Sequence, residues 1–420
     1  MSFYELFDYN SFKWLDIEEK ISEAKLNSLN DVKVLISILS GISVANDVEF
    51  TTIDEICRKK LFSELKIVSI FNDIAFYSLK LKTLFPSSKI SRLNRRCKQV
   101  EFTRSQILCL LSHMVLCTLD KTPKNFYWTT FENWLTDGRC CAIAYLETLL
   151  EYFRQSFEII NHGDSNEYMN EIVSFRRNEA NLDEIETILK SIDRLNPNET
   201  ISLKLNGLIG DDSDVEVDFA NQDIGFGITG TQEEILFGSS PELCVAMLFC
   251  DTLEENEAIA ITGARRVSTF NGYGLNVTLN SFVPIDYQMW KNRVVIAIDA
   301  LDLSYCIDDS FEKQIEAANL KRELVKAFSG FSCVVNKNIS TGHWGCGAFN
   351  GNKQLKALLQ VIAAVASSNQ LIFYCRNDKR FYDKMSEFFC INLKDKNALE
   401  LWKDLLDLTK NNVFDGLFES

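Results

Sequence analysis

The strongest constraint on the fold is a change in sequence pattern near residue 195. Before it, apolar residues recur at helical spacing with few glycines or prolines, over residues 32–42, 62–81, 105–119, 140–157 and 182–192. After it, short strand-like runs alternate with helical segments, which is typical of an α/β layer with helices on both faces of a sheet. The strand candidates are residues 201–205, 215–219, 235–237, 258–262, 294–299 and 371–375, and the helix candidates are 241–253, 311–328 and 355–367. We therefore predict a helical domain over residues 1–195 and an α/β domain over residues 196–420.

The composition narrows the classes of function. Of 420 residues, 46% are hydrophobic and 25% are charged, as in ordinary globular proteins. The formal net charge of −15 argues against a general surface for duplex DNA, because such a surface needs a basic footprint. An anionic ligand held by backbone amides remains compatible with this charge.

Cysteine and histidine usage predicts reduced thiols and no metal site. The 13 cysteines include no Cys-x-x-Cys pair, and the first residues lack a basic region followed by an apolar core. We therefore expect a nuclear or cytoplasmic setting. The three histidines lie far apart without zinc-ligand spacing, and no apolar run reaches membrane-spanning length.

The first glycine-rich segment is VDFANQDIGFGITGTQEEILF, residues 217–237. Its spacing Gly225-x-Gly227-x-x-Gly230 formally matches a dinucleotide-binding fingerprint, which should open a helix directly after a strand. Residues 231–237 instead favour a turn into a short strand, so that interpretation is weak. The glycines fit a loop whose backbone approaches a phosphate, and an ordinary glycine-rich hairpin fits them equally.

Two adjacent carboxylates, Glu233 and Glu234, follow this loop. Neighbours in a regular strand point to opposite faces, so both reach one ligand only if the backbone is irregular, as Gly230 and Thr231 permit. Glycosidic cleavage needs one carboxylic acid to protonate the leaving oxygen and a second carboxylate to stabilise the cationic centre or activate water. Asp218 offers a third carboxylate. An isolated Glu-Glu pair is more often a solvated surface turn.

Two further glycine-rich segments are candidates for ligand contact. TGHWGCGAFNG, residues 341–351, runs into a predicted helix and could cradle a pyrophosphate with its amides and the helix dipole. Within it, His343 is more often a hydrogen-bonding spacer than a base. Tyr273 stands between Gly272 and Gly274, where its ring could close over a base or ribose or rest on the core.

Taken in order, these motifs resemble the catalytic region of the poly(ADP-ribose) glycohydrolase family, whose core is a macrodomain. That family's signature is a glycine triplet followed by Gln-Glu-Glu, and here it corresponds to residues 225–227 and 232–234. The matching segments in the same order are VDFAN (217–221), SSPEL (239–243), ITG (261–263), GY (272–273), AIDAL (297–301), REL (322–324) and GCGAF (345–349). The resemblance covers roughly residues 200–390 and implies a macrodomain-like mixed sheet flanked by helices, preceded by an all-helical accessory domain.

The resemblance also implies an activity and residue roles. The activity is hydrolysis of ribose–ribose bonds in poly(ADP-ribose), releasing ADP-ribose without a metal or cofactor. Glu234 would be the catalytic acid and later the base, Glu233 would bind the terminal ribose, and Asp218 and Asn221 would orient the ribose and the glutamates. The other implied substrate-binding residues are Gly225, Gly227, Gln232, Tyr273, Gly345, Gly347, Ala348, Phe349 and Arg376.

Four features depart from the family pattern. Phe226 replaces the middle glycine of the triplet, and the spacer before Gln232 is short. His343 stands where asparagine is expected, and Arg376 stands where an aromatic residue commonly stacks on adenine, although a guanidinium can stack there too. Two alternatives therefore stay open. One is a macrodomain reader that binds ADP-ribose or poly(ADP-ribose) with little or no turnover, and the other is an interaction protein using its helical half as a scaffold.

The expected partners follow from the same resemblance. They are poly(ADP-ribose), ADP-ribose and proteins that carry the polymer. Neither a membrane nor duplex DNA is expected as a direct partner, in line with the acidic net charge.

Overall fold

The computed structural model describes residues 3–41, 50–119, 129–161, 165–192, 196–286, 289–306, 310–391, 396–408 and 417. The chain forms two compact units that are interleaved in sequence. The helical unit comprises Met1–Phe175, Ile224–Asp251 and Gly263–Lys291, and the sheet unit comprises Arg176–Asp223, Thr252–Thr262 and Asn292–Ser420. A single division at residue 195 would place residues 224–251 with the sheet, whereas they pack in the helical unit.

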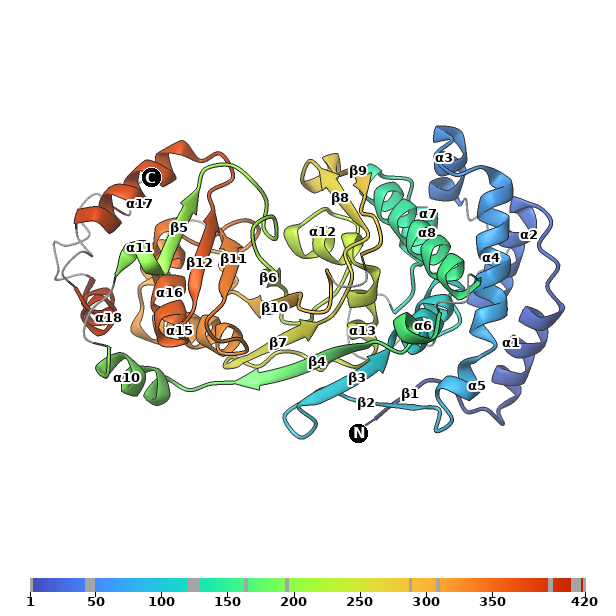
Figure 1. Cartoon of the computed structure of the whole chain (residues 1–420), viewed down its shortest axis with the longest axis horizontal. Coiled ribbons are helices and arrows are strands. Elements are labelled where there is room, and N and C mark those ends of the chain that lie inside the picture. The colour runs from blue at the N-terminus through green and yellow to red at the C-terminus, as the bar shows by residue number, and fades with distance from the viewer. Residues whose placement is uncertain are drawn as a thin grey trace. The chain divides into compact units, whose positions relative to one another are not determined.

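The helical unit is built on amphipathic and fully apolar helices with clear N-caps. Ser28, Ser63 and Thr103 each accept a backbone N–H at a helix start, which satisfies donors that the helix itself leaves open. Figure 1 shows α4 running beside α2 and α8, and α6 packs on α4. The helices are α1 (Phe12–Glu23), α2 (Leu29–Ser40), α3 (Thr51–Lys59), α4 (Glu64–Ser78), α5 (Leu81–Leu84), α6 (Arg104–Val115), α7 (Glu132–Thr136), α8 (Cys140–Asn161) and α9 (Ser165–Met169).

Shorter elements complete the helical unit. They are the two-stranded sheet of β1 (Phe3–Glu5) and β2 (Lys89–Ser91), strand β3 (Gln99–Thr103), the helices α12 (Gln232–Ser239), η2 (Pro241–Val245), α13 (Ala246–Phe249) and η3 (Gly274–Asn276), and the hairpin of β8 (Ser268–Asn271) and β9 (Thr278–Phe282). The predicted strand over residues 235–237 is wrong, because these residues lie in α12. The predicted helix over residues 241–253 is also shorter, as η2 followed by α13.

One mixed eight-stranded sheet has the order β3-β4-β7-β10-β6-β11-β12-β5. From β10 to β5 every neighbouring pair is parallel, whereas β7 is antiparallel to β10. The carboxyl ends of the parallel strands therefore meet at one edge of the sheet. The strands are β4 (Ile172–Glu179), along which the chain passes from one unit to the other, β5 (Ile201–Lys204), β6 (Val215–Ala220), β7 (Glu257–Thr262), β10 (Val294–Asp299), β11 (Asn338–Gly342) and β12 (Gln370–Tyr374).

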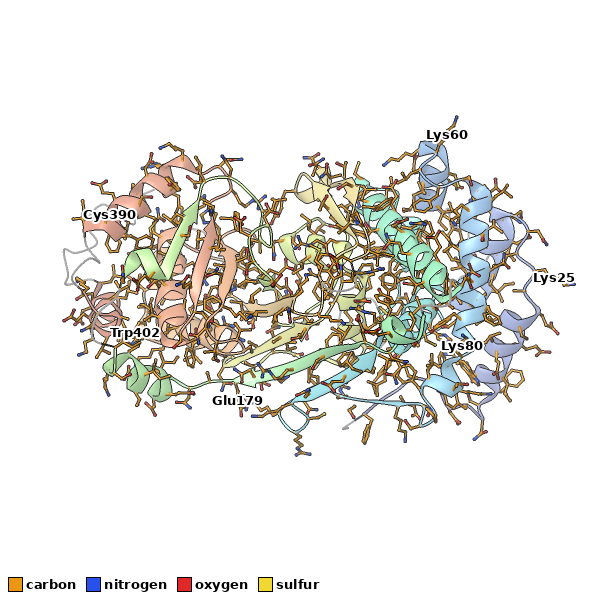
Figure 2. All side chains as sticks on the ribbon, viewed as in Figure 1. Lys25, Lys60, Lys80, Glu179, Cys390 and Trp402 are labelled. Carbon is orange, nitrogen blue, oxygen red and sulfur yellow. The ribbon has the colours of Figure 1, made fainter. Side chains whose placement is uncertain are left out.

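Helices α15 and α16 pack side by side in the sheet unit, with α15 against β7 and β10 and α16 against β12 (Figure 1). Apolar side chains of one sheet face, such as Val217 and Ile296, are fully buried with them. Figure 2 shows side chains filling the space between these helices and the sheet. It also labels Trp402 of α18, which is 1% exposed. The helices of this unit are α10 (Leu182–Lys190), α11 (Pro197–Thr200), α14 (Ser310–Gln314), α15 (Ala317–Phe331), α16 (Lys353–Ala366), α17 (Lys379–Ile391) and α18 (Ala398–Leu406).

The predicted fold class is confirmed: helices lead into an α/β region with a mixed sheet. The predicted strands at residues 201–205, 215–219, 258–262, 294–299 and 371–375 are present within a residue of their expected bounds. In the part of the chain that the structure describes, no helix combines the length and apolarity needed to cross a membrane.

Candidate functional site

The predicted site residues belong to both units. The helical unit holds Gly225, Gly227, Gln232, Glu233, Glu234 and Tyr273, and the sheet unit holds Asp218, Asn221, Gly345, Gly347, Ala348, Phe349 and Arg376. The structure therefore brings together two sets of predicted residues, one within each unit.

The two glutamates lie in the first turn of helix α12, not in a strand. Thr231 is the N-cap: its hydroxyl accepts the N–H of Glu234 at 3.3 Å, and its own N–H donates to the Glu234 carboxylate at 3.2 Å. This reciprocal pair is a capping box, which fixes both the start of the helix and the direction of the Glu234 side chain. Our expectation of a turn into a short strand is corrected by this cap.

The Glu234 carboxyl group is held by its own loop. Oxygen Oε2 accepts hydrogen bonds from the N–H and hydroxyl of Thr229 at 2.7 and 2.8 Å, from the N–H of Gly230 at 2.5 Å, and from the N–H of Thr231. Oxygen Oε1 lies against Gly227, where an added Cβ would come within 2.1 Å of it. The position of the carboxyl group thus depends on the backbone of residues 227–231.

Glu233 is bound to the same loop at Gly225. Its side chain is buried at 8% exposure, and Oε1 accepts the N–H of Gly225 at 2.9 Å. Both glutamates therefore fold back onto the glycine segment, from a helical turn and not from the irregular strand that the sequence suggested.

Gly230 places Tyr273 next to this loop. Its φ of +73° is strained for residues with a Cβ, and an added Cβ would lie 2.1 Å from the carbonyl oxygen of Gly274. The N–H of Gly274 donates to the carbonyl of Gly230 at 2.8 Å. The preceding residue, Tyr273, is therefore next in sequence to a backbone contact of the glutamate loop, and its side chain is 41% exposed.

Phe226 is directed into the interior of the helical unit. Its side chain is 3% exposed and stacks on Phe131 with ring centroids 4.8 Å apart, and Trp134 packs at 4.9 Å. The chain accommodates the bulky side chain in this aromatic cluster. Two members of this cluster, Phe131 and Trp134, come from the helical half of the chain, and the sequence had assigned them no function.

In the sheet unit, Asp218 is a fully buried carboxyl group on β6. Within the described ranges neither of its oxygens has a hydrogen-bond partner. Burial raises the pKa of Asp218 well above its ordinary value, and the negative charge of Glu216 on the same strand adds to the rise. Asn221 follows this strand, and its side-chain oxygen accepts the N–H of Asp223 at 3.1 Å.

The raised pKa of Asp218 gives a pH-dependent stability. The folded state binds this proton more tightly than the unfolded state, so stability is lost as pH rises above the unfolded pKa near 4, by up to about 1.4 kcal/mol per pH unit. Asp218→Asn removes this loss, because the amide keeps the shape and does not titrate. Between pH 4 and pH 8, denaturant unfolding should therefore show a smaller fall in stability for the variant than for wild type. Parallel curves, or the same change in the exposed control Asp302→Asn, would contradict this.

The second glycine segment leads into helix α16, as the sequence predicted, and it starts within strand β11, which was not predicted. Gly345 has φ of +72°, and a Cβ there would lie 2.5 Å from the Ala300 side chain. Trp344 anchors the loop from below through an Nε1 bond to the carbonyl of Ile298 at 3.0 Å. Asn352 caps α16 by accepting the N–H of Leu355. Gly347 and Ala348 are exposed, whereas Phe349 is partly buried.

A buried charge cluster beneath this loop was missed by sequence reasoning. Lys356 of α16 pairs with Glu323 of α15, and its ammonium lies 4.1 Å from the centre of the Trp344 ring. Glu323 also accepts the N–H of Leu301 at 3.0 Å, just after β10. Burial lowers the pKa of Lys356 well below its ordinary value. Only the REL segment signalled part of this cluster in the sequence.

His343 and Arg376 lie at the ends of β11 and β12. The His343 ring packs edge-on against Phe381 and its Nε2 lies 3.2 Å from the carbonyl of Cys375. Burial lowers the pKa of His343 to about 4, which leaves the ring neutral at pH 7 and suits a hydrogen-bonding spacer. Arg376 is exposed, with a left-handed φ of 52°.

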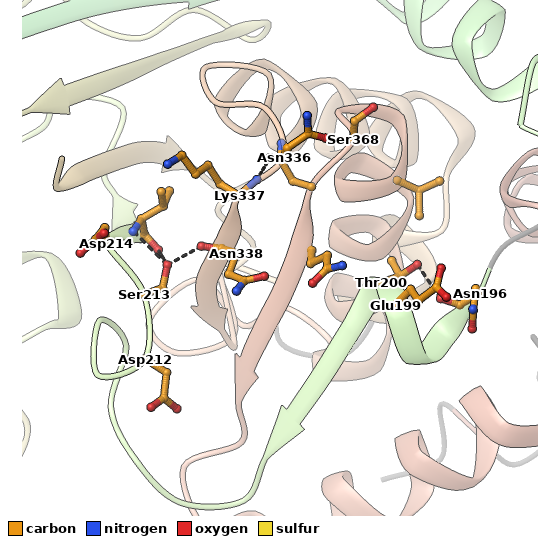
Figure 3. A pocket seen from close by; sticks show the side chains of 14 residues that line it. Asn196, Glu199, Thr200, Asp212, Ser213, Asp214, Asn336, Lys337, Asn338 and Ser368 are labelled. Atoms are coloured by element: carbon orange, nitrogen blue, oxygen red, sulfur yellow. Dashed lines mark hydrogen bonds between the residues drawn. The ribbon is translucent and has the colours of Figure 1, made fainter.

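A polar cavity of about 680 Å³ opens at the amino ends of the parallel strands, opposite the ends that carry the predicted site residues (Figure 3). Its lining includes the first residues of β6, β11 and β12, namely Val215, Asn338 and Gln370. The predicted site residues of the sheet unit instead lie on β6 or follow the carboxyl ends of these strands, and none of them lines this cavity. Among the residues that the structure describes, no cluster of three or more His, Cys, Asp or Glu side chains is arranged to hold a metal ion.

Comparison with protein families gives two matches to one family. Residues 186–383 match the model for the macro domain fold of poly(ADP-ribose) glycohydrolase, and residues 55–177 match the model for the helical domain of the same family.

Curated relatives agree with this family. The chain is 38% identical over 175 residues to poly(ADP-ribose) glycohydrolase 1 of Caenorhabditis elegans, covering 38% of this chain and 22% of that protein. It is 33% identical over 193 residues to poly(ADP-ribose) glycohydrolase 2 of the same organism, covering 42% of this chain and 40% of that protein. The chain thus spans less than half of the length of either relative.

A solved structure of poly(ADP-ribose) glycohydrolase from Deinococcus radiodurans in complex with ADP-ribose aligns at 14% identity. The alignment covers 56% of this chain and 94% of that chain, with a TM-score of 0.33.

Proposed function

Because the chain belongs to the poly(ADP-ribose) glycohydrolase family, we propose that it hydrolyses ribose–ribose glycosidic bonds in poly(ADP-ribose) and releases ADP-ribose. The observation that supports this most directly is the placement of Glu234. Its carboxyl group stands at the start of α12, held through Oε2 by its own glycine loop, with the buried Glu233 beside it. Enzymatic cleavage of a glycosidic bond typically uses two carboxyl groups held at fixed positions.

The chemistry assigned to Glu234 is acid–base catalysis. As an acid, it donates a proton to the bridging oxygen as the bond to the ribose carbon breaks, so that the leaving ribose departs as a neutral hydroxyl. As a base, it then takes a proton from the water that attacks the same carbon. Fixing Oε2 sets the carboxyl plane, so Oε1 is the oxygen assigned to proton transfer. Glu233 binds the hydroxyls of the terminal ribose.

The remaining predicted residues are assigned to substrate binding. Asn221 and Asp218 are assigned to the ribose, and Gln232 and Tyr273 are assigned to the adenosine end. The loop from Gly345 to Phe349 holds the diphosphate and the distal ribose through backbone amides, which suits a chain with a net charge of −15. Arg376 is exposed and is assigned to stacking on adenine.

Incubation of the purified chain with poly(ADP-ribose), with product separated by chromatography and ADP-ribose binding measured by calorimetry, tests the proposal. Release of ADP-ribose supports hydrolysis. Binding of ADP-ribose without release would replace the hydrolase by a macrodomain reader. Neither binding nor release would reject both assignments and leave an interaction role for the helical half.

A further inference from the structure

We propose that Trp134 is a positioning residue for Glu234: from helix α7, it holds the glycine loop that sets the place of the catalytic carboxyl group. This inference rests on the proposed function, because it assigns Trp134 a role in that reaction. Trp134 belongs to the helical part of the sequence, 93 residues before the loop residue that it contacts.

The contact between Trp134 and the loop is specific. Its Nε1 donates a hydrogen bond to the carbonyl oxygen of Gly227 at 2.9 Å, and its side chain is fully buried. The ring also packs against Phe226, the residue before Gly227, and against Phe131, at centroid distances of 4.9 and 4.6 Å. One side chain thus fixes both the backbone and the side chain of adjacent loop residues.

A second anchor from the neighbouring helix acts on the next residue. The Cys141 thiol of α8 donates to the carbonyl of Ile228 at 2.7 Å. Consecutive carbonyls of the loop, at Gly227 and Ile228, are therefore both bound by side chains of α7 and α8. The backbone between residues 226 and 228 has little freedom to shift while these contacts persist.

The held backbone is the one that Glu234 rests on. Gly227 lies against Oε1 of Glu234, close enough that an added Cβ would approach it to 2.1 Å. Just beyond Ile228, the amides of Thr229 and Gly230 bind Oε2. A shift of Gly227 would therefore move both the backbone that lies against Oε1 and the neighbouring amides that bind Oε2.

Phe226 adds a side-chain contact to the two hydrogen bonds that Trp134 and Cys141 make with the loop. Where the family pattern has glycine, the aromatic side chain gives the loop an apolar anchor between Phe131 and Trp134. The spacer to Gln232 is short, so the loop between the anchor and the helix cap spans few residues.

Helix α8 also reaches the surroundings of Glu234. Burial raises the pKa of Tyr145 on α8, and the negative charge of Glu234 adds to the rise, as expected for neighbouring groups. The Tyr145 ring packs on Trp134 at 5.3 Å. Helix α8, which carries Cys141 and Tyr145, packs against α12, the helix that begins with the two glutamates.

Trp134→Phe tests the inference, because it keeps an aromatic ring and removes the N–H donor. Its matched control is Trp14→Phe in α1: Trp14 is equally buried, and in the described part of the chain its Nε1 makes no hydrogen bond. With poly(ADP-ribose) as substrate, we expect kcat of Trp134→Phe to fall about 10- to 100-fold with KM within about threefold of wild type. The control makes the same change of a buried ring without removing a hydrogen bond, so its kcat should fall by less than about threefold.

Undiminished kcat in Trp134→Phe, or an equal fall in both variants, would overturn the positioning role. If wild type shows no turnover, the proposed function fails instead, and amide hydrogen exchange over residues 229–231 decides the positioning role. Exchange at these amides should be at least about tenfold faster in Trp134→Phe than in wild type or the control, because they bind Glu234. An unchanged exchange rate at these amides in Trp134→Phe would reject the positioning role of Trp134, whether or not the protein is active.

Discussion

Glu234→Gln is expected to lower kcat on poly(ADP-ribose) by about 100- to 10,000-fold, the range that a general acid contributes. The amide oxygen can take the place of Oε2 and accept the same N–H groups of Gly230 and Thr231, so the loop and helix α12 should persist. What is lost is a group that can release and recover a proton. Binding of ADP-ribose, measured by calorimetry, should stay within about threefold of wild type.

The control for this variant is Glu255→Gln, the same loss of charge at a side chain that is 81% exposed. It should leave kcat unaltered. Residual turnover of Glu234→Gln above a tenth of the wild-type rate would show that another group carries the proton. A parallel loss of ADP-ribose binding would show that the substitution disturbs the loop. The catalytic acid would then have to be identified with other variants.

Gly227→Ala is expected to lower kcat by about 100-fold with a small effect on stability. The new methyl group would lie 2.1 Å from Oε1 of Glu234, and the side chain must swing away because the backbone on the other side is held by Trp134. A displacement of about 1 Å at a catalytic group costs on the order of 100-fold. Steady-state kinetics and thermal unfolding of the variant measure the two effects separately.

Gly225→Ala is the matched comparison in the same loop. Its Cβ would meet the sulfur of Met247 at 2.8 Å, the end of a flexible side chain that can move without touching Glu234. Its kcat should therefore fall less than about tenfold, against about 100-fold for Gly227→Ala, with any loss of substrate binding measured separately as a rise in KM. Equal losses for the two variants would mean that the loop backbone, and not the Glu234 carboxyl group, is what the added methyl disturbs.

The sequence predicted five strands of the described eight-stranded sheet, because they are short, apolar and separated by clear breaks, but it did not predict β3, β4 or β11. It misplaced Ile235, Leu236 and Phe237, whose β-branched and aromatic run after a glycine segment resembles a strand. The signal that decides otherwise was present, since Thr231 and Glu234 stand at the spacing of a capping box. A local cap therefore outweighs strand propensity over three residues.

The candidate site was predictable where its residues carry family motifs, and unpredictable where they act through contacts distant in sequence. Glu233 and Glu234 fall in the signature itself. Trp134 and Cys141 lie in a helical segment with ordinary apolar spacing, and nothing local distinguishes a core tryptophan from one that binds a loop carbonyl. Their role depends on which distant segment packs beside them, and periodicity within a helix carries no record of that.

The interleaving of the two units bears on how the protein can be dissected. A fragment ending near residue 195 would contain Phe131, Trp134 and Tyr145 but not the loop that covers them, since Phe226 and Gly227 come later in the chain. Those rings would then face water in the truncated product and favour aggregation. Separate expression of the two compact bodies thus calls for rejoining distant stretches of the chain, with residues 224–251 and 263–291 fused to the amino-terminal helices.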